Sequence, residues 1–350
     1  MKPEDKRPKP SFVSAQQVAQ LAGVSRSAVS RAFTPGASIA AETRDKVGKA
    51  AAELGYQVND LARGLLANRS RLVGLVVTKP ELGFRAHLVA ALSRALIRRG
   101  NVPLLINTGD SETEVQAAHT ALFGYRAEAT IILSGSPPAS FSELARQNGQ
   151  PLVMLGRSEP DCDHVRIDNA GAAAKAAALF VERGILRLGL AGSESGTPSI
   201  VERERAFVDE ALRLGATVRT ARGGESDYTG GQQAAAALLG QAERPQAVFC
   251  VNDLIALGLV DAARFRFGLD VPADLSVIGF DDIPEASWDA YRLTTFRQDP
   301  DEMARHAIEQ LDRRLGSPDA APSIVQLDPV LILRDSIRNT ERDSHAYPAR

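Results

Sequence analysis

The chain has 350 residues, of which 44% are hydrophobic and 24% are charged, a composition typical of a folded protein with a sizeable core. No apolar run approaches the roughly 18 residues of a membrane-spanning helix, and the charged start MKPEDKRPKP lacks the apolar stretch of a signal peptide. The sequence therefore predicts a soluble, cytoplasmic protein without a membrane partner. Its two cysteines, Cys162 and Cys250, form no C-x-x-C motif, which fits a reducing compartment.

The net charge of −2 is unevenly distributed along the chain. Residues 1–72 carry 12 basic and 6 acidic side chains, a net charge of +6, whereas the remainder carries 29 basic and 37 acidic side chains, a net charge of −8. No acidic residue occurs between Pro8 and Ala41. A basic front end on an acidic body indicates a polyanionic partner for the front end, although a solvated basic tail would give the same charges.

Three short helices are predicted within residues 11–58. A first helix capped by Ser14 and ended by Gly23 is followed by a second helix capped by Ser25, and a third is predicted from Ala41 to Leu54. The side chains expected to face inward repeat at helical spacing: Val18, Leu21 and Ala22, then Ala28, Val29 and Ala32, then Val47, Ala50, Ala51 and Leu54. Three short helices with a glycine turn between the first two indicate a helix-turn-helix DNA-binding domain.

In a helix-turn-helix the second helix lies in the major groove, with its first residues at the base edges. Arg26 is predicted to contact guanine O6 and N7, Ser27 to contact bases, and Arg31 to contact a base or a phosphate. The hydroxyls expected to position the DNA backbone are those of Ser14, Ser25, Ser30 and Thr43. The alternative is a small helical bundle with an ordinary polar face.

The segments VSAQQVAQLAGVSRSAVSRAF and ETRDKVGKAAAELGYQVNDLARGL together resemble the DNA-binding and hinge region of the LacI/GalR family of bacterial transcriptional regulators, and the resemblance continues through nearly the whole chain. It implies a dimer on a palindromic operator, with residues 59–70 as hinge helix and linker. Asn59 would contact DNA, and Leu65 would insert into the minor groove. Packing of Leu65 against the body is the alternative. The sequence departs from the family at Val58, where a proline is usual.

From Arg71 onward, short apolar runs alternate with helical stretches. The runs are LVGLVV, VPLLIN, EATIILS, PLVMLG, RLGLAG, AVFCVN, LSVIGF and PVLILR. Continuous apolar runs between helices indicate parallel strands buried on both faces, hence two doubly wound α/β subdomains, which the resemblance identifies as periplasmic-binding-protein-like. The break between the halves is predicted near 166–169; LTTFRQDP (293–300) would return the chain to the first half and PVLILRDS (329–336) to the second.

These elements predict five parts of the chain. They are a flexible basic tail (1–10), the helix-turn-helix domain (11–58), the hinge and linker (59–70), an effector-binding and dimerisation domain (71–340) and a polar tail (341–350). The N-subdomain is expected at about 71–167 and 296–325, and the C-subdomain at about 168–295 and 326–340. Because the C-terminal tail lacks heptad repeats, a homodimer is predicted rather than a tetramer.

Motifs for catalysis or cofactor binding are absent from the sequence. GLAGSESGT lacks the P-loop and nucleophile-elbow patterns, and the five histidines are scattered without H-E-x-x-H. The run DCDH, Asp161 to His164, has metal-ligand composition, but a polar surface loop is the favoured interpretation. We therefore predict no enzyme activity, metal or cofactor. The alternative is a cytoplasmic sugar-binding module or sugar-processing enzyme with an incidental basic arm.

Polar side chains follow two predicted strands, at the sheet edge where open α/β folds bind ligands. Asn252 and Asp253 follow one strand, and Asp281 and Asp282 follow another. Amide and carboxylate groups pair well with sugar hydroxyls. Capping of the next helix is the alternative for Asp253 and Asp282.

The resemblance adds an allosteric effector cleft for a small molecule, a sugar or sugar derivative. The cleft residues that it implies are Arg203, Asn252 and Asp281, with Phe84, Arg157, Asp168 and Tyr228 added by position. For Arg203 the alternative is a surface salt bridge with Glu202 or Glu204. A repressor with a protein co-effector is a further alternative.

Overall fold

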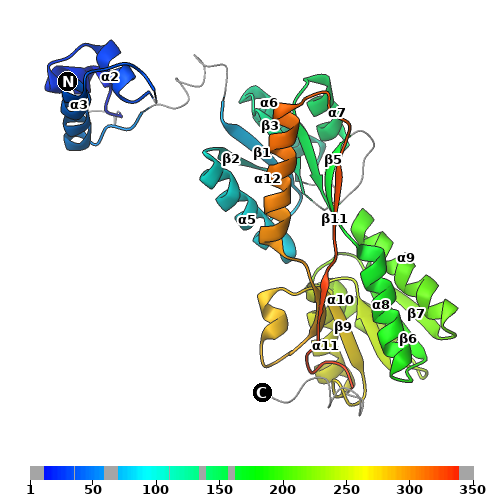
Figure 1. The fold of residues 1–350 in the computed structure, drawn as a ribbon. Coiled ribbons are helices and arrows are strands. Elements are labelled where there is room, and N and C mark those ends of the chain that lie inside the picture. Colours follow the sequence, from blue (N-terminus) through cyan, green and yellow to red (C-terminus); the bar gives the residue numbers. More distant parts are fainter. Residues whose placement is uncertain are drawn as a thin grey trace, which may run out of the picture. The chain divides into compact units, whose positions relative to one another are not determined.

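A computed structural model describes residues 12–34, 36–58, 70–109, 111–133, 139–156 and 162–338 (Figure 1). The chain divides into two compact units between Ser70 and Arg71. The predicted terminal tails and residues 59–69 of the predicted hinge, with Asn59 and Leu65, lie outside the described residues.

The first unit contains three helices with the predicted caps. They are α1 (Ala15–Ala22), α2 (Arg26–Ala32) and α3 (Ala41–Leu54). The Ser14 hydroxyl accepts a hydrogen bond from the Gln17 amide, and the Gln17 side chain accepts one from the Ser14 amide at 2.8 Å, which completes a capping box. Gly23 ends α1 in the left-handed region (φ 65°), and the Ser25 hydroxyl accepts from the Ala28 amide at 3.2 Å.

The helices of this unit enclose a small apolar core. Its buried members are Val18, Ala19, Val29, Val47, Ala50 and Ala51. The predicted inward face was wrong at Leu21, which is 48% exposed, because α1 packs on α2 and α3 through Val18 and Ala19 instead. A large apolar side chain is therefore left on the outside of α1.

The second unit begins with a sheet whose strands run parallel. Its strands are β1 (Leu72–Val77), β2 (Val102–Asn107), β3 (Ala129–Ile132), β4 (Leu152–Leu155), β5 (Asp163–Ile167) and β11 (Ile324–Leu327). They lie in the order β11-β5-β4-β3-β1-β2 and form sheet A. The helices that contact it are α5 (Phe84–Arg99), α6 (Glu112–Gly124), α7 (Ser140–Gln147) and α12 (Pro300–Gly316) (Figure 1).

A second six-stranded sheet, sheet B, completes this unit. Its strands are β6 (Arg187–Ser193), β7 (Thr217–Gly223), β8 (Ala247–Cys250), β9 (Ser276–Asp281), β10 (Thr294–Arg297) and β12 (Val330–Ile332). Their order is β12-β10-β9-β8-β6-β7, and all pairs are parallel except β10 with β12. Its helices are α8 (Asn169–Glu182), α9 (Pro198–Arg213), α10 (Tyr228–Leu239), α11 (Asp253–Asp261), a π turn (Ala262–Arg266) and a 3-10 turn (Pro284–Ser287). The predicted fold of a helix-turn-helix domain followed by two parallel α/β halves is confirmed, with one antiparallel edge strand added.

The chain passes between the two sheets after β5, after β10 and after β11. Residues 293–300 were predicted to return the chain to the first half. That prediction was wrong for β10, the strand within this segment, because Thr294–Arg297 pairs with β9 in sheet B. The crossing follows that strand, and α12 then packs on α5 and β4.

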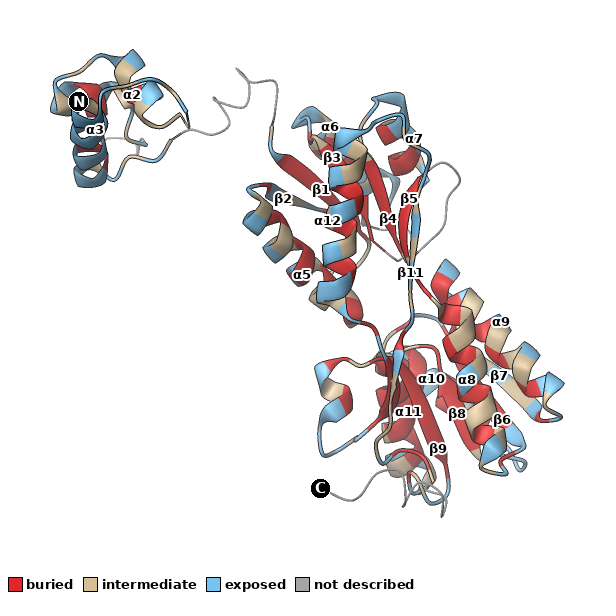
Figure 2. Cartoon of the chain, viewed as in Figure 1, coloured by how far each residue is buried: buried red, intermediate tan, exposed pale blue. Residues whose placement is uncertain are grey.

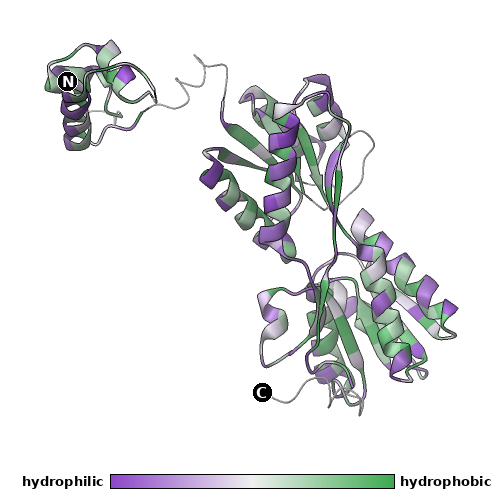
Figure 3. Cartoon of the chain, in the orientation of Figure 1, coloured by the Kyte–Doolittle hydropathy of each residue, from purple (hydrophilic) through white to green (hydrophobic). Residues whose placement is uncertain are grey.

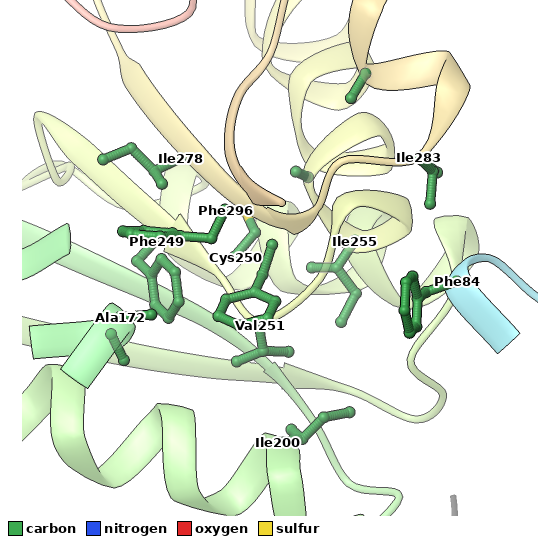
Figure 4. Close-up of a cluster of buried hydrophobic side chains, with 14 of the residues drawn as sticks. Phe84, Ala172, Ile200, Phe249, Cys250, Val251, Ile255, Ile278, Ile283 and Phe296 are labelled. Carbon is green, nitrogen blue, oxygen red and sulfur yellow. The ribbon is translucent and has the colours of Figure 1, made fainter. Parts of the chain in front are cut away.

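Burial and hydropathy follow the layers of the second unit. The strands are mostly buried and apolar, whereas the outer helix faces are exposed and polar (Figures 2 and 3). One buried cluster joins side chains from both sheets, and in it Phe84 of α5 points toward Ile255 and Ile283 (Figure 4). In the part of the chain that the structure describes, no helix combines the length and the apolar character that crossing a bilayer requires.

The prediction of a polar surface loop at residues 161–164 is wrong for residues 162–164, which the structure describes. Asp163 and His164 are buried at the start of β5. Asp163 accepts hydrogen bonds from Arg314 of α12 at 2.8 Å and from the Ser323 amide at 2.9 Å, and Arg313 also contacts it. A buried carboxylate with such donors anchors α12 to β5, next to the edge strand β11 of sheet A.

Helices α10 and α11 approach each other through two glycines. A Cβ atom added to Gly231 would lie 2.2 Å from the carbonyl oxygen of Ile255, and one added to Gly258 would lie 2.0 Å from that of Tyr228. Neither position has room for a side chain unless the helices separate.

We expect Gly258→Ala to lower the free energy of unfolding by about 1–3 kcal/mol, because the added methyl group forces α10 and α11 apart. Gly124→Ala is the matched control, since no atom lies within 4 Å of its added Cβ on α6, and it should leave stability unchanged or raise it by up to about 1 kcal/mol. Urea unfolding followed by circular dichroism measures both. Equal stability of the two variants would contradict the close helix approach.

Candidate functional site

The exposed face of α2 carries the predicted base contacts. Ser25, Arg26, Ser27, Ser30 and Arg31 are all exposed, as is Ser14 at the start of α1. The Ser25 and Ser27 hydroxyls lie 2.8 Å apart, and Arg31 donates from Nε to the Ser27 carbonyl at 3.4 Å. Within the described residues Arg26 donates no hydrogen bond, so its guanidinium is available to a base edge. Contact of these residues with DNA stays a prediction.

A cleft in the second unit is lined from both sheets. Its lining residues are Leu82, Gly83, Phe84, Arg85, Gly156 and Ile167 from the side of sheet A, Asn169, Thr197, Ser199, Ile200, Arg203, Ser226, Asn252, Leu254 and Asp281 from the side of sheet B, and Gln298 and Met303 after the crossing from β10. Most of these residues follow strands or begin helices, which is the usual place for a ligand of an open α/β sheet.

Arg203 is the central charge of this cleft. Its side chain is 5% exposed and donates from Nε to Asn169 Oδ1 at 2.8 Å and from Nη1 to the Val251 carbonyl at 2.7 Å. Its guanidinium lies 3.4 Å from the centre of the Phe280 ring. Burial lowers its pKa to about 10. The surface salt bridge considered for Arg203 is therefore wrong: the side chain points inward.

Asp281 faces Arg203 at the end of β9. Asp281 Oδ1 lies 3.8 Å from Arg203 Nη1 and accepts from Gln298 Nε2 at 2.5 Å. Its backbone has φ 127°, and Asp282 follows with φ 57°. Residues other than glycine rarely adopt such positive φ angles. Burial raises the pKa of Asp281, and the charge of Arg203 opposes that rise. The strained turn fixes the direction of a buried carboxylate.

Asn252 closes the end of β8 and caps α11. Its Oδ1 accepts from the Ile255 amide, and its Nδ2 donates to the Ser226 carbonyl, both at 2.9 Å. Asn252 rather than Asp253 is thus the cap, so the alternative role of Asp253 as a helix cap is wrong.

The two neighbouring aspartates have structural partners. Asp253 is fully buried and accepts from the Thr295 hydroxyl at 2.6 Å and from the Ile283 amide at 2.9 Å. Burial, and then the Asp281 carboxylate, raise its pKa. Asp282 is not a helix cap either, because it pairs with Arg297 at 2.6 Å and with Arg334 at 2.7 Å.

The structure brings together Phe84, Arg203, Asn252 and Asp281 of the predicted effector residues. Asp168 lies outside this lining and caps α8, where it accepts from the Gly171 amide at 2.9 Å. Tyr228 is 37% exposed, and its hydroxyl donates to Asp261 at 2.6 Å. Arg157 lies outside the described residues.

Comparisons with known proteins identify the family of this chain. Residues 15–59 match the family described as bacterial regulatory proteins, lacI family, and residues 177–337 match the periplasmic binding protein-like domain. The ribose operon repressor of Escherichia coli (strain K12) is 30% identical over 331 residues, which cover 93% of this chain and 100% of that repressor. The chain belongs to the LacI family.

Solved structures of LacI-family proteins resemble it over both units. A Lac repressor dimer bound to operator and the anti-inducer ONPF has a TM-score of 0.83 at 26% identity, with 93% of this chain and 99% of that chain covered. The complex of the transcriptional regulator CelR with cellobiose has a TM-score of 0.69 at 28% identity and the same coverage. These relatives are regulators of transcription.

Several cleft residues of this LacI-family chain were missed from the sequence. Gln298 follows β10 and Asn169 follows β5, so the rule that ligands bind at strand ends would have found both. Arg85 carries no such signal, because it lies in the first turn of α5 beside the predicted Phe84.

We expect Gln298→Ala to destabilise the protein by about 1–3 kcal/mol, because the buried Asp281 carboxylate loses a hydrogen-bond donor. Gln241→Ala removes an exposed hydrogen bond to Arg219 and should change stability by less than about 0.5 kcal/mol. Chemical denaturation of both variants measures the difference. A Gln298→Ala variant as stable as the control would show that Asp281 does not depend on this amide.

Proposed function

We propose that this chain is a transcriptional repressor that binds a palindromic operator as a homodimer and is controlled by a small molecule in the cleft of its second unit. The observation that carries this proposal is the presence, in one LacI-family chain, of an exposed α2 with two arginines and a cleft with a buried Arg203–Asp281 pair. The proposed protein is cytoplasmic and not an enzyme, and it needs no cofactor.

DNA recognition is assigned to the first unit. With α2 in the major groove, Arg26 and Ser27 read bases, while Arg31 and the hydroxyls of Ser14, Ser25 and Ser30 hold the backbone. We extend this to the hinge, with Asn59 on the DNA and Leu65 as a wedge in the minor groove. An apolar wedge costs a few kcal/mol of unstacking, which the added contact of bent DNA offsets.

The effector is assigned to the cleft. Phe84 supplies an apolar wall, and Arg203, Asn252 and Asp281 supply donors and acceptors for hydroxyl groups. The name of the ribose operon repressor and the cellobiose complex of CelR support a sugar or sugar derivative. Asp168 and Tyr228 remain candidates that would reach the ligand only after the cleft changes shape, and Arg157 remains a candidate outside the described residues.

The homodimer is supported by large apolar side chains on the surface of the second unit. Phe265 is 86% exposed, Ile97 is 63% exposed and Trp288 is 54% exposed. Contiguous exposed apolar groups are typical of protein interfaces, and these side chains are candidates for such a surface. A twofold dimer also matches the symmetry of a palindromic operator.

Replacing Arg26 with alanine should weaken operator binding by about 1–3 kcal/mol and binding to random DNA by much less, because a bidentate base contact is lost. Gel-shift titrations on operator and scrambled DNA at one salt concentration measure both. Arg205→Ala, an exposed arginine of α9, is the control and should bind operator like the wild type. Equal losses of affinity for operator and for scrambled DNA would show that Arg26 contacts a phosphate and not a base. Weak, sequence-blind binding by the wild type would instead favour the sugar-binding module with an incidental basic arm.

Asp281→Ala and Arg203→Ala should keep operator affinity within a few-fold and lose the response to effector. Each removes a partner of a ligand hydroxyl at a cost of about 1–3 kcal/mol, and a ligand shifts an equilibrium only by its differential affinity for the two states. Calorimetry with the effector and a gel-shift of the same protein test this. Asp281→Asn retains the shape of the side chain and controls for misfolding. Wild-type ligand affinity in these variants would place the effector site elsewhere.

A further inference from the structure

The charges that line the cleft are unbalanced. The charged residues among its described lining are Arg85, Arg203 and Asp281. Both guanidinium groups act on the same carboxylate, because Arg203 and Arg85 each lower the pKa of Asp281 against the effect of burial. Two cations therefore share one anion in the cleft, where Arg203 and Asp281 are buried and Arg85 is half-buried.

Nearby carboxylates offset this imbalance only in part, because burial still lowers the pKa of both arginines. Glu202 lies 3.5 Å from Arg166, and Glu225 lies 2.9 Å from Lys79. Asp253 lies beneath the cleft, where burial raises its pKa and favours the uncharged form. Glu81 is exposed to solvent, which screens its charge.

Arg85 is placed where its charge is unfavourable for the fold. It is the second residue of α5, and the first turn of that helix contains no acidic side chain. Gly83 precedes the helix with φ 52° and provides no side-chain cap. A cation at the positive end of a helix dipole is repelled, so this position stabilises α5 less than an acidic residue would. Locally unfavourable residues of this kind are expected where function requires them.

Both arginines also keep donors free for a ligand. Arg85 donates from Nη1 to the Thr78 carbonyl at 2.8 Å, and Arg203 uses Nε and Nη1. Three guanidinium nitrogens donate to no described residue. They are Nη2 of Arg203 and Nε and Nη2 of Arg85. Burial lowers the pKa of Arg85 as it does that of Arg203, so the neighbouring carboxylates do not fully offset the loss of water around either group.

We propose that the effector carries an anionic group, a carboxylate or a phosphate, which binds between Arg85 and Arg203 while the hydroxyls of the same molecule meet Asp281 and Asn252. This inference rests on the proposed role of the cleft and specifies its ligand as an acidic or phosphorylated polyol. Paired guanidinium groups match the planar carboxylate and the phosphate through charge-assisted hydrogen bonds. A neutral sugar would leave the two guanidinium groups with the Asp281 carboxylate as the one anion in the described lining of the cleft.

Thermal unfolding of the full chain with matched probes tests the proposal. The probes are glucose, glucuronate and glucose 6-phosphate, ribose and ribose 5-phosphate, and inorganic phosphate, all at one ionic strength. An anionic probe should raise Tm by several degrees more than its neutral parent, since a ligand of the folded state stabilises it. The glucuronate and phosphate-ester arms separate a carboxylate from a phosphate.

Variants locate the anion. Arg85→Gln should weaken binding of the anionic probe about tenfold or more and remove its advantage over the neutral parent, and Arg85→Lys should restore part of it. Arg94→Gln, at an exposed arginine further along α5, and Lys49→Gln, at an exposed lysine of α3 in the first unit, should retain the full advantage. The second control tests whether the basic surface of the first unit contributes to binding of the anion.

Three results would overturn the proposal: neutral parents that stabilise as much as the anions, an advantage that survives in Arg85→Gln, or no stabilisation by any anion. A gel-shift on operator with the same probes separates this failure from failure of the proposed function. If a neutral sugar bound the cleft and changed operator affinity, the effector role of the cleft would stand and the proposed anionic group would be wrong. If the ligand still changed operator affinity in every Arg203 and Asp281 variant, the cleft would not be the effector site, and the proposed function of the cleft would fail.

Discussion

The buried guanidinium of Arg203 holds the cleft side of sheet B together. It reaches from α9 to Asn169 at the start of α8, to the carbonyl of Val251 after β8, and to Phe280 and Asp281 at the end of β9. Four segments distant in sequence are thereby fixed by one side chain. Because removing one partner of a buried charge costs several kcal/mol, these segments are expected to move as one body.

Local signals predicted the first unit almost completely. The capping box of Ser14 and Gln17, the left-handed Gly23 and the Ser25 cap act over three or four residues, so they can be recognised without knowing the rest of the fold. The apolar runs gave the parallel sheets for a similar reason, since burial on both faces leaves a continuous pattern. Leu21 was wrongly predicted to face inward, because helical spacing does not show that the small Ala19 lets α1 pack closely on its neighbouring helices.

The cleft was only partly predictable because its contacts are not local. Strand ends pointed to Asn252 and Asp281, but nothing in the sequence around Asp168 shows that its side chain is used by the Gly171 amide. Tyr228 was assigned by position, and its hydroxyl instead meets Asp261, 33 residues later. Arg85 was missed because an arginine in the first helical turn reads as an ordinary exposed residue until the opposite sheet is in view.

The pairing of the last two strands bears on how the chain matures during synthesis. β11 forms an edge of sheet A, and β12 forms an edge of sheet B, so sheet A is complete only at Leu327 and sheet B only at Ile332. The DNA-binding unit lies within the first 70 residues of the chain, so it emerges from the ribosome long before that. A nascent or prematurely ended chain would therefore present the DNA-binding unit before its regulatory cleft exists. The two C-terminal strands therefore complete the sheets that carry the cleft after the DNA-binding unit has been made.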